Sequence, residues 1–441
     1  MTALQTHATI ASLPPTLRIP RTRPDPMTTS LQALLAQDLD ALTALARGQG
    51  VNVPPRPWID GLATAIADVH RGGAGDDAHF GCGVLEVHEE GFGFLRSPAD
   101  DYLPGAADIY VSQSQIRRFR LRTGDSVIGR IRPPKDQERY PALLRVEAIN
   151  GAPPDADVVS FEDLVAVHPT SRLPLSRDRW LRVVDCLAPL GLGARGLIVG
   201  PSRSPRSELM RRLAAAFQGE AGLVVQVLLL GERPEEITDW RESVRCDVTA
   251  TTFDEPPSRH LHVADIVFER ARRLAERGSE VLLLVDSFSR LLRFALAAVA
   301  QPGHLVDGVE ADALHRLRGL LGAGRDLRDA GSITVIGSLN GTEDPLSAAL
   351  LRDVEESLSW QLHLLDAAPP AGLPFTPDIA RSFTRRADRL LPADEHARRE
   401  QWRQRATQSG SGPSAEAGFD ALRQALRHAE GGDGAEVAPP T

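Results

Sequence analysis

The spacing of apolar residues changes along the chain, and each change predicts a new structural unit. In residues 31–72, the runs LQALLAQDLDALTALARG and PPRPWIDGLATAIADVH place apolar side chains at helical intervals, which predicts a small helical domain. Residues 1–30 are rich in Pro and Thr and have no apolar period, so we expect them to be disordered. Met27 is an alternative start, because the first periodic segment follows it. The GGAGDD stretch after Arg71 has the composition of a linker.

Residues 80–150 switch to a period of two. Their apolar runs are short and are broken by Gly and Pro, as in GVLEVHEEGFGFLRS, DIYVSQSQIRRF, DSVIGRIRPP and ALLRVEAIN. Short strands that each end at a turn signal are typical of a small β-barrel. We therefore predict a small all-β barrel of the OB-fold, cold-shock-like kind for this segment.

Residues 158–408 alternate buried-type strands with helical segments. The strands GLIVG, LVVQVLLLG, VLLLVDS and SITVIGS are almost continuously apolar, which indicates a parallel sheet covered by helices on both faces. The fold class expected for this domain is therefore α/β. Residues 409–441 begin with a Gly/Ser-rich stretch, continue with one predicted helix (FDALRQALRHAE) and end in a polar tail. The chain contains no internal repeat.

Composition narrows the class of protein. Hydrophobic residues make up 42% of the chain, and no apolar run approaches the roughly 20 residues of a membrane helix, so we expect no membrane association. The start lacks the apolar core of a signal peptide, and the three cysteines are too far apart in sequence for a zinc or disulfide framework. Both features favour a reduced, cytoplasmic setting.

The charge balance limits how nucleic acid could bind. A formal charge of −9 argues against a protein that coats nucleic acid through a global positive field, so any RNA or DNA site must be local. Lys135 is the only lysine, and all other Lys/Arg positions are arginine. Arginine content alone is weak evidence for any partner.

The segment Gly91–Arg96, GFGFLR, carries the most specific local signal. Alternation in a strand puts Phe92 and Phe94 on one face, where two rings form a stacking platform for unpaired bases. The alternative is that both rings fill the barrel interior, which is about as common for an isolated FGF tripeptide; the flanking glycines and Arg96 favour RNA. Further phosphate, stacking and base-edge contacts are expected from Arg96, Tyr110, Arg117, Arg118, Glu138, Arg139 and Tyr140.

A phosphate loop is expected between the strand GLIVG and the helix that follows it. The pattern GxxxxGK[ST] falls on Gly200-Pro201-Ser202-Arg203-Ser204-Pro205-Arg206-Ser207, with Pro205 in place of the second Gly and Arg206 in place of Lys. Proline has no N–H to donate to a phosphate, and a planar guanidinium is bulkier than an ammonium. Ser207 keeps the hydroxyl that holds Mg²⁺.

Two carboxylates follow buried strands of the same domain. Asp286 ends VLLLVDS, in the place of an acidic residue that orients Mg²⁺, and Glu232 ends LVVQVLLLGE, where it could orient the attacking water. Each alone is more often a solvated carboxylate. Together, at the carboxyl edge of one parallel sheet, they favour a nucleotide site.

These segments, in this order, resemble the bacterial transcription termination factor Rho family over roughly residues 30–430. The resemblance implies an OB-fold that binds single-stranded, pyrimidine-rich RNA, followed by a RecA-like P-loop NTPase domain. It also implies hexameric rings that hydrolyse ATP with Mg²⁺, move along RNA and release transcripts from the RNA polymerase elongation complex. The runs that carry it are GVLEVHEEGFGFLRS, DIYVSQSQIRRFRLRTGD, GRIRPPKDQERYPALLRVEAIN, APLGLGARGLIVGP, GERPEEIT, TTFDEPPSRH, LLLVDSFSRL, ADALHR and DIARSFTRR.

The resemblance also implies residue roles. Glu232 matches the catalytic glutamate, Asp286 the Mg²⁺-associated aspartate, and Arg381 the arginine offered to the γ-phosphate of a neighbouring subunit. Arg203 and Arg206 stand where the family has two phosphate-loop lysines. The primary RNA site falls on Phe92, Phe94, Arg96, Tyr110, Glu138, Arg139 and Tyr140, and the nucleotide site on Gly200, Arg203, Ser204, Pro205, Arg206 and Ser207.

Departures from the family pattern gather in the motor. Besides Pro205 and Arg206, Gly231 replaces an aspartate, Pro345 replaces a pore-loop lysine, and the other pore loop, 301–309, is shortened with His304 in place of a lysine. The segment 354–359 exchanges a basic for an acidic residue. Two functions stay open: a working terminator, or an ATPase-deficient RNA-binding regulator in a homohexamer or mixed ring. A decaying copy is disfavoured, because its core would accumulate polar residues.

Overall fold

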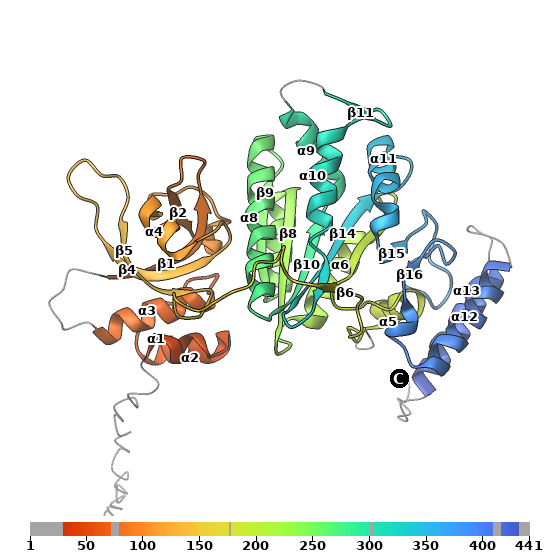
Figure 1. Cartoon of the computed structure of the whole chain (residues 1–441). Coiled ribbons are helices and arrows are strands. Elements are labelled where there is room, and N and C mark those ends of the chain that lie inside the picture. The colour runs from red at the N-terminus through yellow and green to blue at the C-terminus, as the bar shows by residue number, and fades with distance from the viewer. Residues whose placement is uncertain (1–29, 72–78, 176–177, 300–302, 409–415, 432–441) are drawn as a thin grey trace, which may run out of the picture.

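The computed structural model describes residues 30–71, 79–175, 178–299, 303–408 and 416–431. Of the segment 1–30 that is expected to be disordered, residues 1–29 lie outside these ranges, whereas Ser30 caps the first helix. The linker after Arg71 and the polar tail after residue 431 also lie outside these ranges. Figure 1 shows a helical unit below a small barrel, and an α/β domain beside them. No helix in the described ranges is long and apolar enough to cross a membrane.

Three short helices form the helical unit. Their apolar faces meet in a core that includes Leu34, Leu42 and Ile66, all fully buried. Side-chain caps start the first two helices: the Ser30 hydroxyl accepts from the Ala33 amide, and Asp38 caps the second helix in the same way. The helices are α1 (Leu31–Leu35), α2 (Leu39–Gly48) and α3 (Ile59–Arg71).

The period-two segment closes into a barrel with strand order β1-β2-β3-β5-β4. Its interior is filled by aliphatic side chains such as Leu85, Leu95 and Val111. Gly93 is required where two strands approach closely, because a Cβ there would lie 2.6 Å from the Glu86 carbonyl oxygen. The elements are β1 (His79–Val87), β2 (Gly93–Arg96), η1 (Pro98–Asp100), β3 (Ile109–Val111), α4 (Gln113–Phe119), β4 (Ser126–Arg132) and β5 (Ala142–Ile149). The predicted OB-fold barrel is confirmed.

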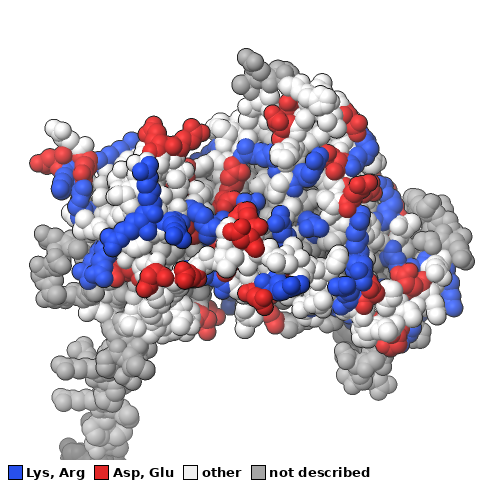
Figure 2. Space-filling view, viewed as in Figure 1, with Lys and Arg blue, Asp and Glu red and all other residues white. Residues whose placement is uncertain are grey.

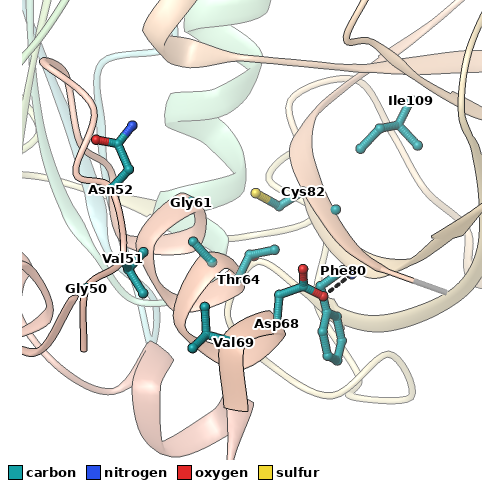
Figure 3. A pocket seen from close by; sticks show the side chains of 12 residues that line it. Gly50, Val51, Asn52, Gly61, Thr64, Asp68, Val69, Phe80, Cys82 and Ile109 are labelled. Atoms are coloured by element: carbon teal, nitrogen blue, oxygen red, sulfur yellow. Dashed lines mark hydrogen bonds between the residues drawn. The ribbon is translucent and has the colours of Figure 1, made fainter. Parts of the chain in front are cut away.

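A pocket of about 550 Å³ opens between α3 and β1 (Figure 3). Its wall includes Thr64, Asp68 and Cys82, and the Asp68 carboxylate accepts from the Phe80 amide at 3.0 Å. Burial raises the pKa of the Cys82 thiol to about 12, which favours the protonated thiol over the thiolate. None of the residues expected to bind RNA or nucleotide lines this pocket.

The α/β domain is built on a nine-stranded sheet whose main order is β16-β15-β7-β14-β10-β8-β9. The strands from β15 to β9 run parallel, which brings their carboxyl ends to one edge. Their bounds are β7 (Arg195–Gly200), β8 (Leu223–Glu232), β9 (Asp247–Thr252), β10 (Glu280–Asp286), β14 (Ser332–Asn340) and β15 (Trp360–His363). The antiparallel additions are β6 (Ala166–Val167), β13 (Arg325–Leu327) and β16 (Phe383–Thr384), and β11 (Leu305–Val306) with β12 (Val309–Glu310) forms a separate hairpin.

Helices cover both faces of this sheet, which confirms the predicted α/β, RecA-like class. Alternation within β10 shows the two layers: Leu283 belongs to one core cluster, and Leu282 and Leu284 belong to the other. The first cluster contains residues of α8 (Pro257–Glu276), α9 (Phe288–Ala298), α10 (Ala311–Leu321) and α11 (Pro345–Val354). The second contains residues of α5 (Arg179–Leu187), α6 (Arg206–Phe217), α7 (Pro234–Ser243), α12 (Ala393–Gln408) and α13 (Glu416–Gly431). Two short 3₁₀ helices, η2 (Glu355–Ser357) and η3 (Ala387–Arg389), complete the domain.

A buried carboxylate joins the barrel to the α/β domain. Glu276, at the end of α8, is fully buried and is bound by the guanidinium of Arg122 at 2.5 and 3.0 Å. It also pairs with Arg273 at 3.0 Å and accepts from the Phe161 amide at 2.8 Å. Because a buried charge needs such partners, these contacts fix the barrel against α8.

Candidate functional site

Four aromatic rings gather on the outside of the barrel. Phe94 lies opposite Tyr110 in the β2–β3 pair, and their ring centroids are 6.0 Å apart. Phe92 lies 5.8 Å from Phe94 and 5.9 Å from Tyr110, and Tyr140 lies 4.9 Å from Phe94. All four are partly exposed, and none belongs to the barrel's interior cluster. We call Phe92, Phe94, Tyr110 and Tyr140 the aromatic platform.

The platform follows from strand alternation. In β2, Leu95 points into the barrel, so Phe94 points outward, and Gly93 leaves room on the inner side. Gly91 adopts φ +85° in the turn before β2, a conformation that favours glycine. The interpretation in which Phe92 and Phe94 fill the barrel interior therefore does not match the structure.

Arg96 lies beneath the platform rather than on the surface. It is 5% exposed, its Nε donates to Glu86 at 2.7 Å, and its Nη1 pairs with Asp108. Its guanidinium carbon lies 5.0 Å from the Phe94 ring centroid. The sequence suggests a phosphate contact for Arg96, whereas in the structure Glu86 on β1 and Asp108, just before β3, hold it under Phe94. Neither Glu86 nor Asp108 was singled out from the sequence.

The loop between β4 and β5 borders the platform. Arg132 binds the Glu138 carboxylate through both terminal nitrogens, at 2.5 and 2.9 Å, and this pairing lowers the pKa of Glu138 to about 2. The Lys135 amide also donates to Glu138, at 3.1 Å. Arg139 is exposed, and its guanidinium carbon is 5.3 Å from the Tyr140 centroid. Glu138 thus shapes the loop, and Arg139 supplies a surface cation.

Charges of both signs are mixed over the face of the molecule shown in Figure 2. Figure 2 shows acidic and basic side chains interspersed over the visible face, and neither sign covers it. This distribution agrees with the formal charge of −9, which leaves only local positive sites for a polyanion.

The phosphate loop folds onto itself. The Ser204 amide and hydroxyl both donate to the Pro201 carbonyl, at 2.9 and 2.7 Å, and the Arg206 amide donates to the Ser204 carbonyl at 2.9 Å. Pro205, between them, has no N–H. Gly200 has no room for a side chain, since a Cβ would lie 2.6 Å from the Ser204 Oγ. Three consecutive positions therefore offer no unused backbone donor to a phosphate.

The two residues expected to hold Mg²⁺ do come together. The Ser207 hydroxyl donates to Asp286 at 2.5 Å, and Ser338 donates to the other carboxylate oxygen at 2.6 Å. In the described part of the chain, no three His, Cys, Asp or Glu residues cluster as a metal site. Mg²⁺ usually keeps several waters and takes phosphate oxygens alongside one or two carboxylates, so the Ser207–Asp286 pair fits this ion.

Arginines occupy the neighbouring positions. Arg206 donates to the Asn340 side chain at 2.9 Å, and burial lowers the pKa of its guanidinium although Asp286 and Glu343 oppose that shift. The Glu232 carboxylate is held by Arg290, with one Nη2–Oε1 distance of 3.2 Å. Asn340 and Arg290 were not foreseen from the sequence. They are held there by β14 and α9, far from the loop along the chain.

Two further arginines lie on the surface. Arg203 in the phosphate loop and Arg381 after β15 are both exposed. The positive charge of Arg381 contributes to a low pKa at His363, about 3, although burial is the larger cause. Within one chain, neither arginine has a hydrogen bond or ion pair from its side chain to the Ser207–Asp286 pair.

Three described segments fall on positions where the sequence suggests pore loops. Pro345 is the first residue of α11, a position that tolerates its missing N–H. Asp307 in the β11–β12 hairpin pairs with Arg352 at 2.9 Å, while Leu305 in that hairpin is 54% exposed. Glu355 and Glu356, both exposed, follow α11.

The chain is similar to known proteins in both of these regions. Residues 81–155 match the Rho termination factor RNA-binding domain, and residues 181–367 match the nucleotide-binding domain of the ATP synthase alpha/beta family. The proteins named "Transcription termination factor Rho" from Escherichia coli K12, Salmonella typhimurium LT2 and Buchnera aphidicola subsp. Schizaphis graminum are each 39% identical over 377 residues. Each alignment covers 83% of this chain and 90% of the relative.

Proposed function

Because the chain belongs to the transcription termination factor Rho family, we propose that it binds single-stranded, pyrimidine-rich RNA on the aromatic platform and acts in transcription termination. The observation that carries the proposal is the position of the four rings: they are partly exposed, adjacent and outside the barrel core. Bases of an unpaired strand stack on such rings, with about 1–3 kcal/mol per base. Arg139 and the edge of Tyr140 extend the face towards the strand's phosphates and base edges.

The buried base of the platform supports this function. Arg96 contacts the underside of Phe94, and its guanidinium is paired with Glu86 and Asp108. It therefore holds the Phe94 ring in place from below. A ring held from below loses little conformational freedom when a base stacks on it. Arg96 is therefore proposed as a positioning residue for RNA binding.

The first form of the proposal is a working motor. In it, ATP with Mg²⁺ supplies the free energy for movement along RNA, and the subunits form a homohexamer that acts on the RNA polymerase elongation complex. Ser207 and Asp286 would hold the ion, and Glu232 would orient water after Arg290 releases it. Arg381, exposed on the surface, would reach the nucleotide of a neighbouring subunit.

A second form is an RNA-binding regulator that does not hydrolyse ATP, alone or in a mixed ring with an active factor. The phosphate loop favours this form: Pro205 lacks a donor, and the amides of Ser204 and Arg206 are already used within the loop. The acidic and apolar pore segments favour it as well, since they offer little to RNA phosphates.

The deciding experiment measures ATP hydrolysis by the purified full chain, with Mg²⁺, in the presence and absence of cytidine-rich RNA. Turnover stimulated by RNA means that the altered loop still binds phosphates, and supports the working motor. Absence of turnover with RNA binding intact supports the regulator.

RNA binding itself is tested by substitution of the platform. Phe92→Ala with Phe94→Ala should weaken binding to a cytidine-rich single strand by roughly tenfold or more for each ring. The matched control is Phe253→Ala, which removes a phenylalanine that is 64% exposed in the α/β domain. Equal affinity of the wild type and the double variant for that strand would refute the platform.

A further inference from the structure

A fifth ring lies against the aromatic platform. His88 follows β1, and its imidazole stacks on Phe92 with centroids 5.1 Å apart and planes 17° apart. It also meets Phe94 edge-on at 5.6 Å. The β1–β2 turn holds this position, because the His88 amide donates to the Phe92 carbonyl and the Gly91 amide donates to the His88 carbonyl, each at 2.8 Å. The rings therefore form a continuous surface from Tyr140 to His88.

One imidazole nitrogen of His88 faces a shared carboxylate. Its Nε2 is buried, has no hydrogen-bond partner among the described residues, and lies 3.9 Å from Glu86 Oε1. The same Glu86 carboxylate accepts from Arg96 at 2.7 Å and lies 3.5 Å from Nε2 of His262 on α8. The side chain of His88 is 38% exposed, so it is open both to this cluster and to solvent.

The charges under the platform do not balance while the histidines are neutral. Glu86 and Asp108 carry two negative charges against the single positive charge of Arg96. The same turn carries the exposed Glu89 and Glu90, and α8 places His262 near Glu86. The charges of Asp265 and Arg259 on α8 also act on His262, but Asp265 is paired with Arg316 and Arg259 with Glu255. The phosphates of a bound RNA add further negative charge beside these carboxylates. A protonated imidazole would offset part of that negative charge.

Resting on the proposed RNA-binding function, we propose that His88 is a fifth, titratable ring of the RNA-binding face. It stacks on the base beyond the one held by Phe92, and in its protonated form it adds the positive charge that Glu86 and the RNA phosphates both attract. His262 is the less available partner, because burial lowers the pKa of its imidazole despite the nearby Glu86.

The first test separates contact with RNA from mere support of Phe92. Wild type and His88→Ala are titrated with oligocytidylates of increasing length, from two to six nucleotides. If His88 holds a base, the variant binds the longer oligomers roughly tenfold more weakly, and its affinity stops rising one nucleotide earlier. An equal loss at every length would mean that His88 only supports Phe92, and no loss would mean that it does nothing for binding; either result overturns the proposal.

The second test follows affinity between pH 6 and pH 8, at constant ionic strength. Wild-type affinity for the six-nucleotide oligomer should fall as the pH rises, towards tenfold per pH unit where one proton is taken up. His88→Phe keeps a ring that can stack, so it should bind at pH 8 but lose most of this dependence. His262→Gln, the matched control on α8, should keep it. A dependence that survives in His88→Phe overturns the proposal.

Phe94→Ala distinguishes a failure of the aromatic platform from a failure of the role proposed for His88. If Phe94→Ala loses RNA binding and both His88 variants behave like the wild type, the platform stands and only the role of His88 is refuted. If the wild type itself binds no RNA, the proposed function fails, and the role of His88 fails with it.

Discussion

Two substitutions towards the family's phosphate-loop pattern test whether Pro205 and Arg206 limit the binding of ATP. Pro205→Gly returns the missing N–H, and Arg206→Lys returns a compact ammonium. The first change should not disrupt α6, because the contact that Pro205 makes to the helix is through its carbonyl, which accepts from the Leu209 amide at 3.0 Å. Glycine keeps that carbonyl and also removes the ring that constrains the loop.

The expected magnitude follows from the number of donors. One hydrogen bond to a charged group contributes about 1.5–3 kcal/mol, which corresponds to roughly 10- to 150-fold in affinity. Arg206→Lys removes the 2.9 Å hydrogen bond to Asn340 and replaces the guanidinium near Asp286 with a smaller ammonium group. Because residues 205 and 206 are adjacent, the effects of the two substitutions on ATP affinity need not add. We expect Pro205→Gly to bind ATP at least tenfold more tightly, and the double variant to bind more tightly still.

Titration calorimetry with Mg²⁺ and a non-hydrolysable ATP analogue measures this directly on the wild type, both single variants and the double variant. Pro257→Gly is the matched control, since it makes the same substitution at the first residue of α8, away from the loop. If neither Pro205→Gly nor the double variant gains affinity, the loop is not the main obstacle to nucleotide binding, and the reasoning from donor counts is refuted.

Further predictions concern the metal pair, the domain joint and acid stability. Asp286→Asn should remove the Mg²⁺ dependence of nucleotide binding and leave RNA affinity unchanged; loss of RNA affinity as well would contradict separate sites. Glu276→Gln removes the counter-charge of Arg122 and one of the two carboxylates that pair with Arg273, the other being Glu269. Chemical denaturation should therefore show that the free energy of unfolding falls by about 3–5 kcal/mol, and a fall below about 1 kcal/mol would contradict the joint. Burial lowers the pKa of His363 from 6.5 to about 3 in the folded chain. Between these two pH values the imidazole is protonated in the unfolded chain and neutral in the folded chain. The free energy of unfolding should therefore fall by about 1.4 kcal/mol per pH unit as the pH drops below about 6.5, and His363→Gln should reduce that slope.

Features that depend on a local pattern of residues could be predicted from the sequence. Alternation puts Phe92 and Phe94 on one face, and the flanking glycines with Arg96 favour the outer face, where the structure has both rings. The apolar strands predict the parallel sheet whose edge carries Asp286. The contact between Ser207 and Asp286 agrees with the same pattern, since Asp286 ends β10 and Ser207 lies at the start of α6, which follows the parallel strand β7.

Contacts between distant segments could not be predicted from local pattern. Arg96 looks like a surface cation in the run GFGFLR, and only the pairing of β2 with its two neighbours brings Glu86 and Asp108 against it. The stacking of His88 on Phe92 likewise depends on the geometry of a turn and not on alternation. In the phosphate loop, the sequence identifies the missing N–H of Pro205, but the use of the adjacent amides within the loop depends on its folded path.

The β4–β5 loop carries a chemical handle that the rest of the molecule lacks. Lys135 is the only lysine among 441 residues, and it is exposed in the loop that Glu138 and Arg132 hold beside Tyr140. An amine-reactive dye will therefore attach at this one side chain, besides the amino terminus, without any cysteine being introduced. The fluorescence of a dye at Lys135 should change when a ligand binds to the neighbouring rings, and no substitution in the chain is needed to attach it.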